Sequence, residues 1–258
     1  MKVVLLAGGF GTRISEESMN KPKPMIEIGE MPILWHIMKH YSYYGYNEFV
    51  ICAGYKQRYI KEWFQNYFID FSDVTFDYTN GQEVVVHHKR IDPWKVTIVD
   101  TGLRTMTGGR VKRIREYVNE EPFMLTYGDA VCDVNISRLA EFHRSHGKLA
   151  TLTAVFQGQK KGVLDIGDTG AVRSFREKRS GDGVAINAGY MVLEPEVFTY
   201  LENDQTVFEN VILERLAGEG QLMSYQHTGF WQCMDSVREH QILEAYWNTG
   251  NAPWKVWE

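Results

Sequence analysis

The sequence predicts an α/β protein with a Rossmann-like, mostly parallel sheet flanked by helices. The first half of the chain alternates short β-branched runs with segments whose apolar residues recur at helical spacing. This alternation is typical of parallel sheets, because the crossover between two parallel strands usually carries a helix. The second half contains more short strands separated by glycines, so we expect a β-rich insertion there. With 258 residues, the chain is long enough for one large domain.

The elements of the first half follow one another closely. Pro32 suits the first turn of a helix and Gly45 suits its end. The aromatic residues between 59 and 68 fall at helical spacing and predict a core-facing helix. The predicted strands are 2–7, 48–54, 74–79, 83–89, 96–100 and 122–131, and the predicted helices are 32–45, 56–70, 108–118 and 135–147.

The second half is predicted to end in helices. Ser236 and Glu239 have the spacing of a capping box, which opens a helix to about residue 248. The tail after it contains two tryptophans, so we expect it to pack against a surface and to be compatible with a subunit interface. The predicted strands are 148–156, 162–166, 170–177 and 183–194, and the earlier helices are 195–202 and 206–218.

Composition excludes several classes of protein. The formal net charge is −5 and no basic block occurs, which argues against a nucleic-acid groove and against an anionic membrane surface. No apolar run approaches the roughly 20 residues of a membrane span, and the first residues lack the pattern of a signal peptide. We therefore expect a cytoplasmic protein. Three cysteines lie far apart without CxxC spacing, so neither a zinc site nor a disulfide framework is expected.

A glycine-rich loop follows the first strand, in the sequence KVVLLAGGFGTR. It lacks the GK pair of a P-loop and the third glycine of a dinucleotide-binding fingerprint. Its glycines nevertheless allow backbone N–H groups to turn toward an anion, and Arg13 adds a planar fork that fits phosphate. Ten residues later, the prolines of KPKPM stiffen the chain on both sides of Lys23. The pair of segments predicts a triphosphate site, whereas the alternative is a turn beside a solvated basic loop.

LAGGFGTR followed by KPKPM resembles the signature of the sugar-phosphate nucleotidyltransferases, the nucleotide-sugar pyrophosphorylases. Further stretches are similar to the branch of that family that makes CDP-glucose; they are GYKQRYIKEWFQNYF, VTIVDTG, MTGGRVKRI, LTYGDAV, SFREK, INAGYMVL, GFWQCMD and APWKVWE. The resemblance implies the nucleotidyltransferase fold over residues 1–258 as a single domain. Residues 1–135 would mainly bind nucleotide, 136–235 would mainly bind sugar, and 236–258 would form a C-terminal helix and tail.

The resemblance also implies a reaction and its participants. CTP and α-D-glucose 1-phosphate would give CDP-glucose and pyrophosphate, by in-line attack of the sugar phosphate on the α-phosphorus. The product would serve deoxysugar and O-antigen synthesis, and the enzyme would be a homo-oligomer, a trimer or hexamer. Because no covalent intermediate is needed, catalysis would consist of positioning and charge neutralisation.

Most of the catalytic and nucleotide-binding residues implied by the resemblance lie in the first half. Arg13 and Lys23 would neutralise charge on the reacting phosphates. Asp129 and Asp235 would hold Mg²⁺, which takes oxygen ligands and usually only one or two carboxylates; a helix N-cap or a turn is the alternative for each. We interpret Asp133 as a turn carboxylate. The nucleotide-binding set is Leu6, Ala7, Gly8, Gly9, Phe10, Gly11, Thr12, Arg13, Lys23, Thr105, Gly109 and Arg110.

Two further segments carry alternatives of their own. The glycines of MTGGR, residues 106–110, suit a close approach to the base or ribose, but a helix N-cap followed by a surface arginine would read the same way. On the sugar side the implied residues are Glu177, Lys178, Asn187 and Trp231. Glu177 and Lys178 could instead form a surface ion pair on a strand.

Four positions depart from the pattern expected for glucose-specific members, and all lie after residue 129, where the acceptor should bind. They are Ala130, Lys161, Arg179 and Ala188. They leave open CMP transfer to a different phosphorylated sugar or polyol. A catalytically silent, nucleotide-binding regulatory relative is a further alternative, but the presence of Arg13, Lys23, Asp129 and Asp235 argues against it. The preference for CTP over other nucleotides rests on the resemblance alone.

Overall fold

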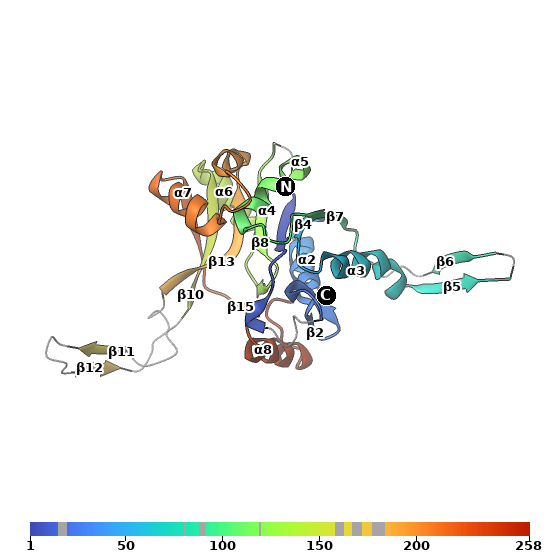
Figure 1. Ribbon diagram of the computed structural model, residues 1–258. Coiled ribbons are helices and arrows are strands. Elements are labelled where there is room, and N and C mark those ends of the chain that lie inside the picture. Colours follow the sequence, from blue (N-terminus) through green and yellow to red (C-terminus); the bar gives the residue numbers. More distant parts are fainter. Residues whose placement is uncertain are drawn as a thin grey trace.

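The computed structural model describes residues 1–14, 20–79, 81–87, 91–118, 120–157, 163–166, 172–176 and 184–258. At its centre is a seven-stranded sheet in the order β14–β10–β13–β8–β1–β4–β7 (Figure 1). Neighbouring strands of this sheet are parallel except beside β13, which runs antiparallel to β10 and β8. The strands are β1 Val3–Ala7, β4 Glu48–Ala53, β7 Lys95–Asp100, β8 Phe123–Tyr127, β10 Ala150–Gln157, β13 Val184–Leu193 and β14 Leu222–His227. The predicted mostly parallel sheet is confirmed.

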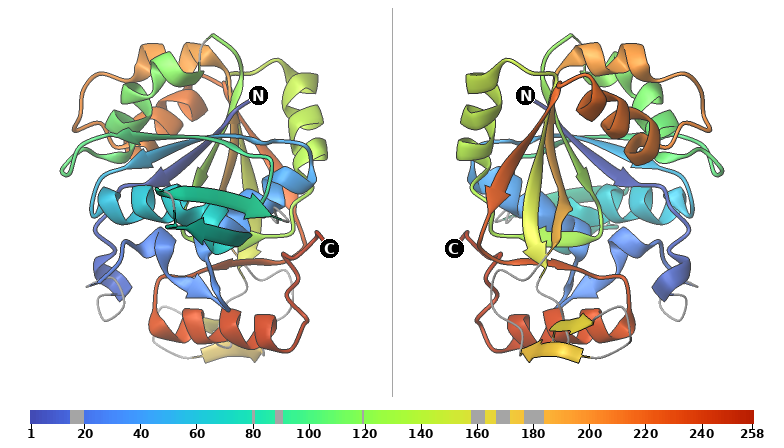
Figure 2. Two further views of the ribbon diagram at one scale, coloured as in Figure 1. Left: turned by 90° about the vertical axis from the view of Figure 1, so that its right-hand side faces the viewer. Right: turned by 90° about the vertical axis from the view of Figure 1, so that its left-hand side faces the viewer.

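Helices lie on both sides of the strands (Figure 2). The strand β1 illustrates the reason, since it carries apolar side chains on both of its faces. Its residues alternate between two hydrophobic clusters, because successive side chains of a strand point to opposite faces. Val3, Leu5 and Ala7 join the first cluster, whereas Val4 and Leu6 join the second. The first face is covered by α2 Ile33–Tyr43, α3 Gln57–Asp70 and α6 Ile136–His146, and the second by α4 Thr107–Arg113, α5 Arg115–Val118, η3 Pro195–Tyr200, η4 Phe208–Leu213 and α7 Glu214–Gly218. The helix α8 Val237–Asn248 lies beyond the ends of the strands (Figure 2) and contributes Leu243 to the first cluster.

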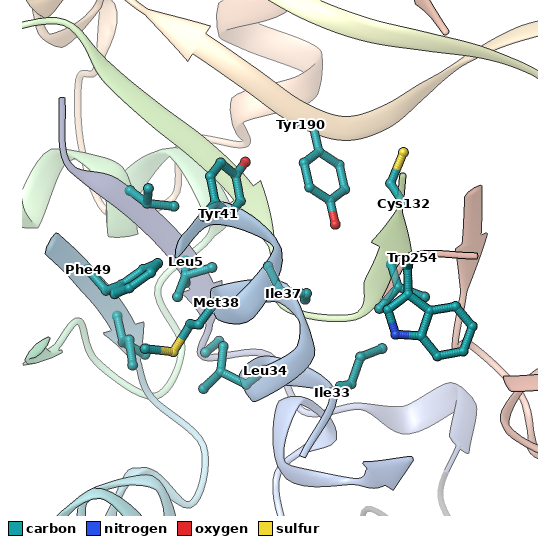
Figure 3. Packing of buried hydrophobic residues seen from close by; sticks show 14 of the residues in the cluster. Leu5, Ile33, Leu34, Ile37, Met38, Tyr41, Phe49, Cys132, Tyr190 and Trp254 are labelled. Atoms are coloured by element: carbon teal, nitrogen blue, oxygen red, sulfur yellow. The ribbon is translucent and has the colours of Figure 1, made fainter. Parts of the chain in front are cut away.

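The first cluster is built around α2 (Figure 3). Tyr41 of this helix stacks on Tyr190 of β13, with ring centroids 5.8 Å apart. Trp254, from the C-terminal tail, is fully buried in the same cluster and stacks on Phe230 at 5.6 Å. The tail therefore packs into the core of its own chain, and Trp254 is not available to a subunit interface.

Several short strands lie outside the central sheet. The strands β5 Asp73–Asp77 and β6 Glu83–His87 pair with each other, as do β11 Val163–Ile166 and β12 Val172–Arg176. These two hairpins project from opposite sides of the molecule (Figure 1). Because β10, β13 and β14 join the central sheet, the part of the predicted β-rich insertion that stands apart from it is smaller than the sequence suggested. The remaining pairs are β2 Glu27–Ile28 with β3 Met31–Pro32 and β9 Ala130–Cys132 with β15 Trp231–Cys233.

Three helices differ in detail from expectation. On α3, Ile60 and Tyr67 are buried but Tyr59 and Phe68 are exposed, so the aromatic run is only partly a core face. The predicted helix 195–202 is a 3-10 helix, η3. The predicted helix 206–218 is a π-helical turn, η4, followed by the short helix α7. Among the residues the structure describes, no helix has the length and apolarity needed to cross a membrane.

Candidate active site

A cavity of about 440 Å³ lies at the carboxyl ends of β1, β7 and β8, the edge at which open α/β sheets bind ligands. Three segments that follow these strands form its walls; they are 6–12, 103–107 and 127–129. Asp129 and most of the predicted nucleotide-binding residues line it; these are Leu6, Ala7, Gly8, Gly9, Phe10, Gly11, Thr12, Lys23, Thr105 and Arg110. Segments far apart in the sequence therefore meet around one cavity.

The glycine loop contains two neighbouring glycines in different surroundings. A Cβ on Gly8 would lie 2.1 Å from Nη1 of Arg110, so Gly8 makes room for that side chain. A Cβ on Gly9 would meet no atom of the described residues within 4 Å, and Gly9 is exposed. Gly11 has a φ of +65°, which suits glycine. The loop thus has a packed half and an open half, and the open half faces the space a ligand would use.

Arg110 joins the loops around the cavity. Its Nη1 donates hydrogen bonds to Oγ1 of Thr101 at 2.8 Å and to the carbonyl of Gly102 at 2.8 Å. Burial lowers the pKa of its guanidinium, which still stays protonated because arginine does not lose its proton in proteins. The alternative of a surface arginine is wrong, since Arg110 is 5% exposed. The residue contributes a fixed positive charge and holds the loop after β7.

The glycines of MTGGR have a packing role that the sequence did not indicate. A Cβ on Gly109 would lie 2.6 Å from Cα of Asp204, and one on Gly108 would lie 2.7 Å from the carbonyl oxygen of Thr206. The close approach at these glycines is thus made by the protein's own turn before η4. Gly109 does not line the cavity, and its contact with a nucleotide stays a prediction.

Lys23, Asp129 and Asp235 converge at the edge of the cavity. Nζ of Lys23 lies 2.6 Å from Oδ2 of Asp129 and 2.5 Å from Oδ1 of Asp235. The lysine side chain is 9% exposed, whereas the two carboxylates are 30% and 27% exposed. Burial alone would lower the pKa of Lys23, but the attraction of Asp129 and the hydrogen bonds to both carboxylates outweigh it and raise that pKa. Lys23 is therefore protonated at neutral pH.

The pairing of β9 with β15 explains how two distant aspartates meet. Asp129 directly precedes β9, and Asp235 is the second residue after β15. The two strands run antiparallel with Ala130 opposite Cys233, and the N–H of Met234 donates to the carbonyl of Asp129 at 2.9 Å. Register therefore brings both carboxylates to one point. Two carboxylates around a single cation also fit a divalent ion such as Mg²⁺, which prefers oxygen ligands, and the Lys23 ammonium here lies where they converge.

The side chain of Arg13 and four positions expected on the sugar side lie outside the described part of the chain. The backbone of Arg13 belongs to the 3-10 turn η1 Thr12–Ile14, but its side chain lies outside the described part of the chain. Glu177 and Lys178 lie outside the described residues, as do Lys161 and Arg179. The contacts of these side chains stay predictions.

Asn187 and Trp231 each bond to a backbone group of residues 188–189, and neither lines the cavity. Oδ1 of Asn187 accepts from the N–H of Gly189 at 2.8 Å, and Nε1 of Trp231 donates to the carbonyl of Ala188 at 2.8 Å. Both side chains are half-buried. Ala188 itself is 2% exposed and Ala130 is 4% exposed, so the side chains at these two positions are packed inside the protein.

Asp133 fastens the turn before β15. Its Oδ1 accepts from the N–H of Phe230 at 2.7 Å and from Nε2 of His227 at 2.8 Å. Cys132, Asp133 and His227 bring possible ligand atoms within 4.8 Å of one another, and Asp133 and His227 are hydrogen-bonded to each other. The geometry supports the interpretation of Asp133 as a turn carboxylate.

Glu209 and Tyr127 line the cavity but were missed by sequence reasoning. Tyr127 ends β8 just before Asp129, and Glu209 lies in η4, with more than eighty residues between them in the chain. The hydroxyl of Tyr127 donates to Oε1 of Glu209. No motif marks Glu209, because η4 reads as an ordinary helix in the sequence and its position depends on tertiary packing.

The fold and the site together define a nucleotide-using transferase, with a glycine loop, a buried lysine and paired carboxylates at one sheet edge. The chain matches the family model described as nucleotidyl transferase over residues 2–248, and it belongs to that family. It is 55% identical to a glucose-1-phosphate cytidylyltransferase from Salmonella typhi, with both chains covered completely. It is 42% identical to a probable glucose-1-phosphate cytidylyltransferase from Bacillus subtilis, again over both full lengths.

Solved structures of lower identity share the fold. A UDP-glucose pyrophosphorylase complexed with UDP-glucose superimposes with a TM-score of 0.68 at 15% identity, covering 96% of this chain and 98% of that one. A Yersinia pseudotuberculosis protein complexed with GMP-PN gives a TM-score of 0.68 at 22% identity, covering 95% and 99%. The predicted nucleotidyltransferase fold is thereby confirmed.

Proposed function

We propose that this enzyme transfers CMP from CTP to α-D-glucose 1-phosphate and releases pyrophosphate. The product, CDP-glucose, would enter deoxysugar and O-antigen synthesis. The observation that carries the proposal is that the glycine loop, Lys23 and Asp129 line one cavity, with Asp235 bonded to Lys23 beside them. The choice of CTP and glucose 1-phosphate is supported by relatives that carry this activity in their names and match the whole chain.

The reaction requires positioning and charge neutralisation. A phosphate oxygen of the sugar 1-phosphate attacks the α-phosphorus in line, and pyrophosphate leaves on the opposite side. The loop from Leu6 to Thr12 binds the triphosphate, with Gly9 and its neighbours presenting backbone N–H groups. Lys23 and Arg13 neutralise the charge that develops on the transferred phosphoryl and the leaving group. Thr105, Gly109 and Arg110 complete the nucleotide side.

Asp129 and Asp235 would hold Mg²⁺. The ion, when bound, supplies positive charge beside the phosphates and stabilises the leaving pyrophosphate. The two carboxylates already accommodate the Lys23 ammonium between them, which supports a role as a cation site. Glu177, Lys178, Asn187 and Trp231 would bind the sugar phosphate, so residues 136–235 would form the mainly sugar-binding part of the chain.

The test is pyrophosphate release with Mg²⁺, with CTP, UTP, dTTP, ATP and GTP each combined with several sugar 1-phosphates. We expect turnover with CTP and glucose 1-phosphate well above every other pair. If turnover is highest with CTP and a different acceptor, the proposed acceptor is wrong, but the proposed transfer of CMP still holds. Absence of release in every combination would overturn the proposed reaction, and calorimetry with CTP would then test a binding role.

We also propose a homo-oligomer, a trimer or hexamer, in the cytoplasm, the compartment in which CTP and sugar 1-phosphates are available. The β5–β6 hairpin projects from the body (Figure 1) and exposes Phe76, Tyr78, Val84 and Val85. A two-stranded hairpin is marginally stable by itself, and an exposed apolar surface marks an interaction site. Phe76 and Val84 face each other across the hairpin, so a second copy of the chain would cover both.

Light scattering after size-exclusion chromatography measures the oligomeric state. The wild type should elute as a trimer or hexamer, and Phe76→Glu should shift it toward monomer. A control on the same strand is Thr75→Ser, which should leave the mass unchanged. A monomeric wild type would contradict the proposal.

A further inference from the structure

Glu209 is a carboxylate in the cavity wall to which the proposed chemistry gives no task. It is half-buried and lies in the π-helical turn η4. Such turns are rare and often occur at functional sites. Thr107 and Tyr127 line the cavity beside it.

Two hydroxyl groups hold the Glu209 carboxylate in one orientation. Oε1 accepts from the hydroxyl of Tyr127, and Oε2 accepts from Oγ1 of Thr107 at 2.7 Å. Oγ1 of Thr107 in turn accepts from the N–H of Phe208 at 2.9 Å. Burial, together with the negative charge of Glu209, raises the pKa of Tyr127, so the phenol remains a donor. Each carboxylate oxygen has a further lone pair available to a ligand.

The position of Tyr127 connects Glu209 to the sugar side. A Cβ on Gly189 of β13 would lie 2.4 Å from Cδ2 of Tyr127, so the phenol ring packs directly against that glycine. The N–H of the same glycine donates to Oδ1 of Asn187 at 2.8 Å. A short chain of contacts therefore runs from Asn187 through Gly189 and Tyr127 to Glu209.

The charge of Glu209 restricts what it can contact. A carboxylate repels the phosphates of both substrates, so its free lone pairs suit a neutral donor such as a hydroxyl group. Hydrogen bonds to an ionised acceptor are stronger than those between neutral groups. A site with a fixed polar group also discriminates strongly against a ligand that lacks the matching hydroxyl.

We propose that Glu209 is a specificity-determining residue that accepts hydrogen bonds from hydroxyl groups of the acceptor sugar. Tyr127 and Thr107 are positioning residues that hold the carboxylate in place. This inference rests on the proposed function, because it assigns the residue to the sugar 1-phosphate of that reaction. The alternative source of hydroxyl groups is the ribose of the nucleotide, and the kinetic constants separate the two.

The experiment compares Glu209→Gln with Glu214→Gln, a control at an exposed glutamate of the adjoining helix α7. Steady-state pyrophosphate release gives KM for each substrate. For Glu209→Gln we expect the KM for glucose 1-phosphate to rise about 10- to 100-fold, the size of a lost charged hydrogen bond, with the KM for CTP within about twofold of the wild type. Both constants should be unchanged in Glu214→Gln. A rise in the KM for CTP alone, or no change in either constant, would overturn the inference.

Deoxy sugar phosphates give a second readout that a merely structural role would not move. The wild type should turn over at least one monodeoxy glucose 1-phosphate about tenfold less efficiently than glucose 1-phosphate, and Glu209→Gln should lose that discrimination. Equal discrimination in both enzymes would overturn the inference. If Glu209→Gln does not fold, Tyr127→Phe carries the same test with a smaller rise in the KM for the sugar phosphate.

The proposed function can fail separately. If the wild type prefers another sugar phosphate over glucose 1-phosphate, the acceptor in the proposed function is wrong, and the same comparison is made with the preferred acceptor. The inference about Glu209 then stands or falls on its own KM values.

Discussion

The two sides of the site are built differently. On the side proposed to bind the nucleotide, the glycine loop and Lys23 belong to one stretch of about twenty residues that begins at β1. On the side proposed to bind the sugar, each side chain comes from its own element: Tyr127 from β8, Asn187 from β13, Glu209 from η4 and Trp231 from β15. A local stretch can form a phosphate site from its own backbone, whereas the second side exists only when several elements are assembled.

The aspartate pair combines features of both sides, because its two residues are distant in sequence but are joined by a single pairing of strands. Asp129 and Asp235 are 106 residues apart, yet the β9–β15 pairing places both against Lys23. Substitutions on the nucleotide side should therefore act on chemistry and CTP binding directly. Substitutions on the sugar side should act through packing as well.

The largest effect is expected at Lys23. In Lys23→Met, the reacting phosphates lose their cation and the two aspartates lose their shared partner, so kcat should fall about 100- to 1,000-fold. The matched control is Lys21→Met, because Lys21 pairs with Glu27 at 2.9 Å, away from the aspartates. Pyrophosphate release measures both variants. A Lys23→Met enzyme with a kcat near that of the control would contradict the assigned role.

Alanine substitutions at Gly8 and Gly9 test separately the packing of the loop and its contact with a ligand. Gly8→Ala places a methyl group 2.1 Å from Arg110 and should lower the free energy of unfolding by about 1–3 kcal/mol. Gly9→Ala should leave unfolding within about 0.5 kcal/mol, since no atom in the described part of the chain approaches its Cβ within 4 Å. It should still raise the Kd for CTP, because the methyl enters ligand space. Urea denaturation measures the free energy of unfolding of both variants, and calorimetry measures their Kd for CTP. A Gly9→Ala protein less stable than the Gly8→Ala protein would contradict the prediction.

On the sugar side, Gly189→Ala combines two costs. Gly189 has a φ of +81°, and its Cβ would lie 2.4 Å from Tyr127, so we expect a loss of about 1–2 kcal/mol together with a higher KM for the sugar phosphate. Gly147→Ala is the control for the backbone cost, because Gly147 has a φ of +62° and an open Cβ position among the described residues. It should destabilise the fold and leave both KM values unchanged. If Gly189→Ala and the wild type have the same KM for the sugar phosphate, the proposed effect of Tyr127 on sugar binding is contradicted.

The smallest expected effect per residue is the loss of stability caused by each buried histidine as pH falls. Burial lowers the pKa of His36, His40 and His143 from 6.5 to about 4. Below about pH 6.5 the unfolded chain binds protons that the folded chain excludes, so these residues destabilise the fold as pH falls from about 6.5 toward 4. Between pH 7.5 and 6 we expect each to cost under about 1 kcal/mol. Urea denaturation at both values checks this, and a wild type more stable at pH 6 would contradict it.

The fold class and the capped helix α8 could be predicted because each depends on a local pattern. The glycine loop and Lys23 were expected at one site for the same reason, and both line the cavity, while their roles stay predictions. Ser236 caps that helix by accepting from the N–H of Glu239, as its spacing indicated. The need for a glycine at position 109 could not be predicted, because the turn at Asp204 against which it packs lies about a hundred residues away in the sequence. Glu209 was missed for the same reason, and the burial of Trp254 depends on a core formed by several helices.

A crystal structure of the enzyme with CTP would test the central claim most directly. We expect the triphosphate to lie against the loop from Gly8 to Thr12, with its α-phosphate near Lys23 and the base and ribose toward Thr105. CTP bound elsewhere, with the glycine loop and Lys23 free of phosphate, would contradict the account.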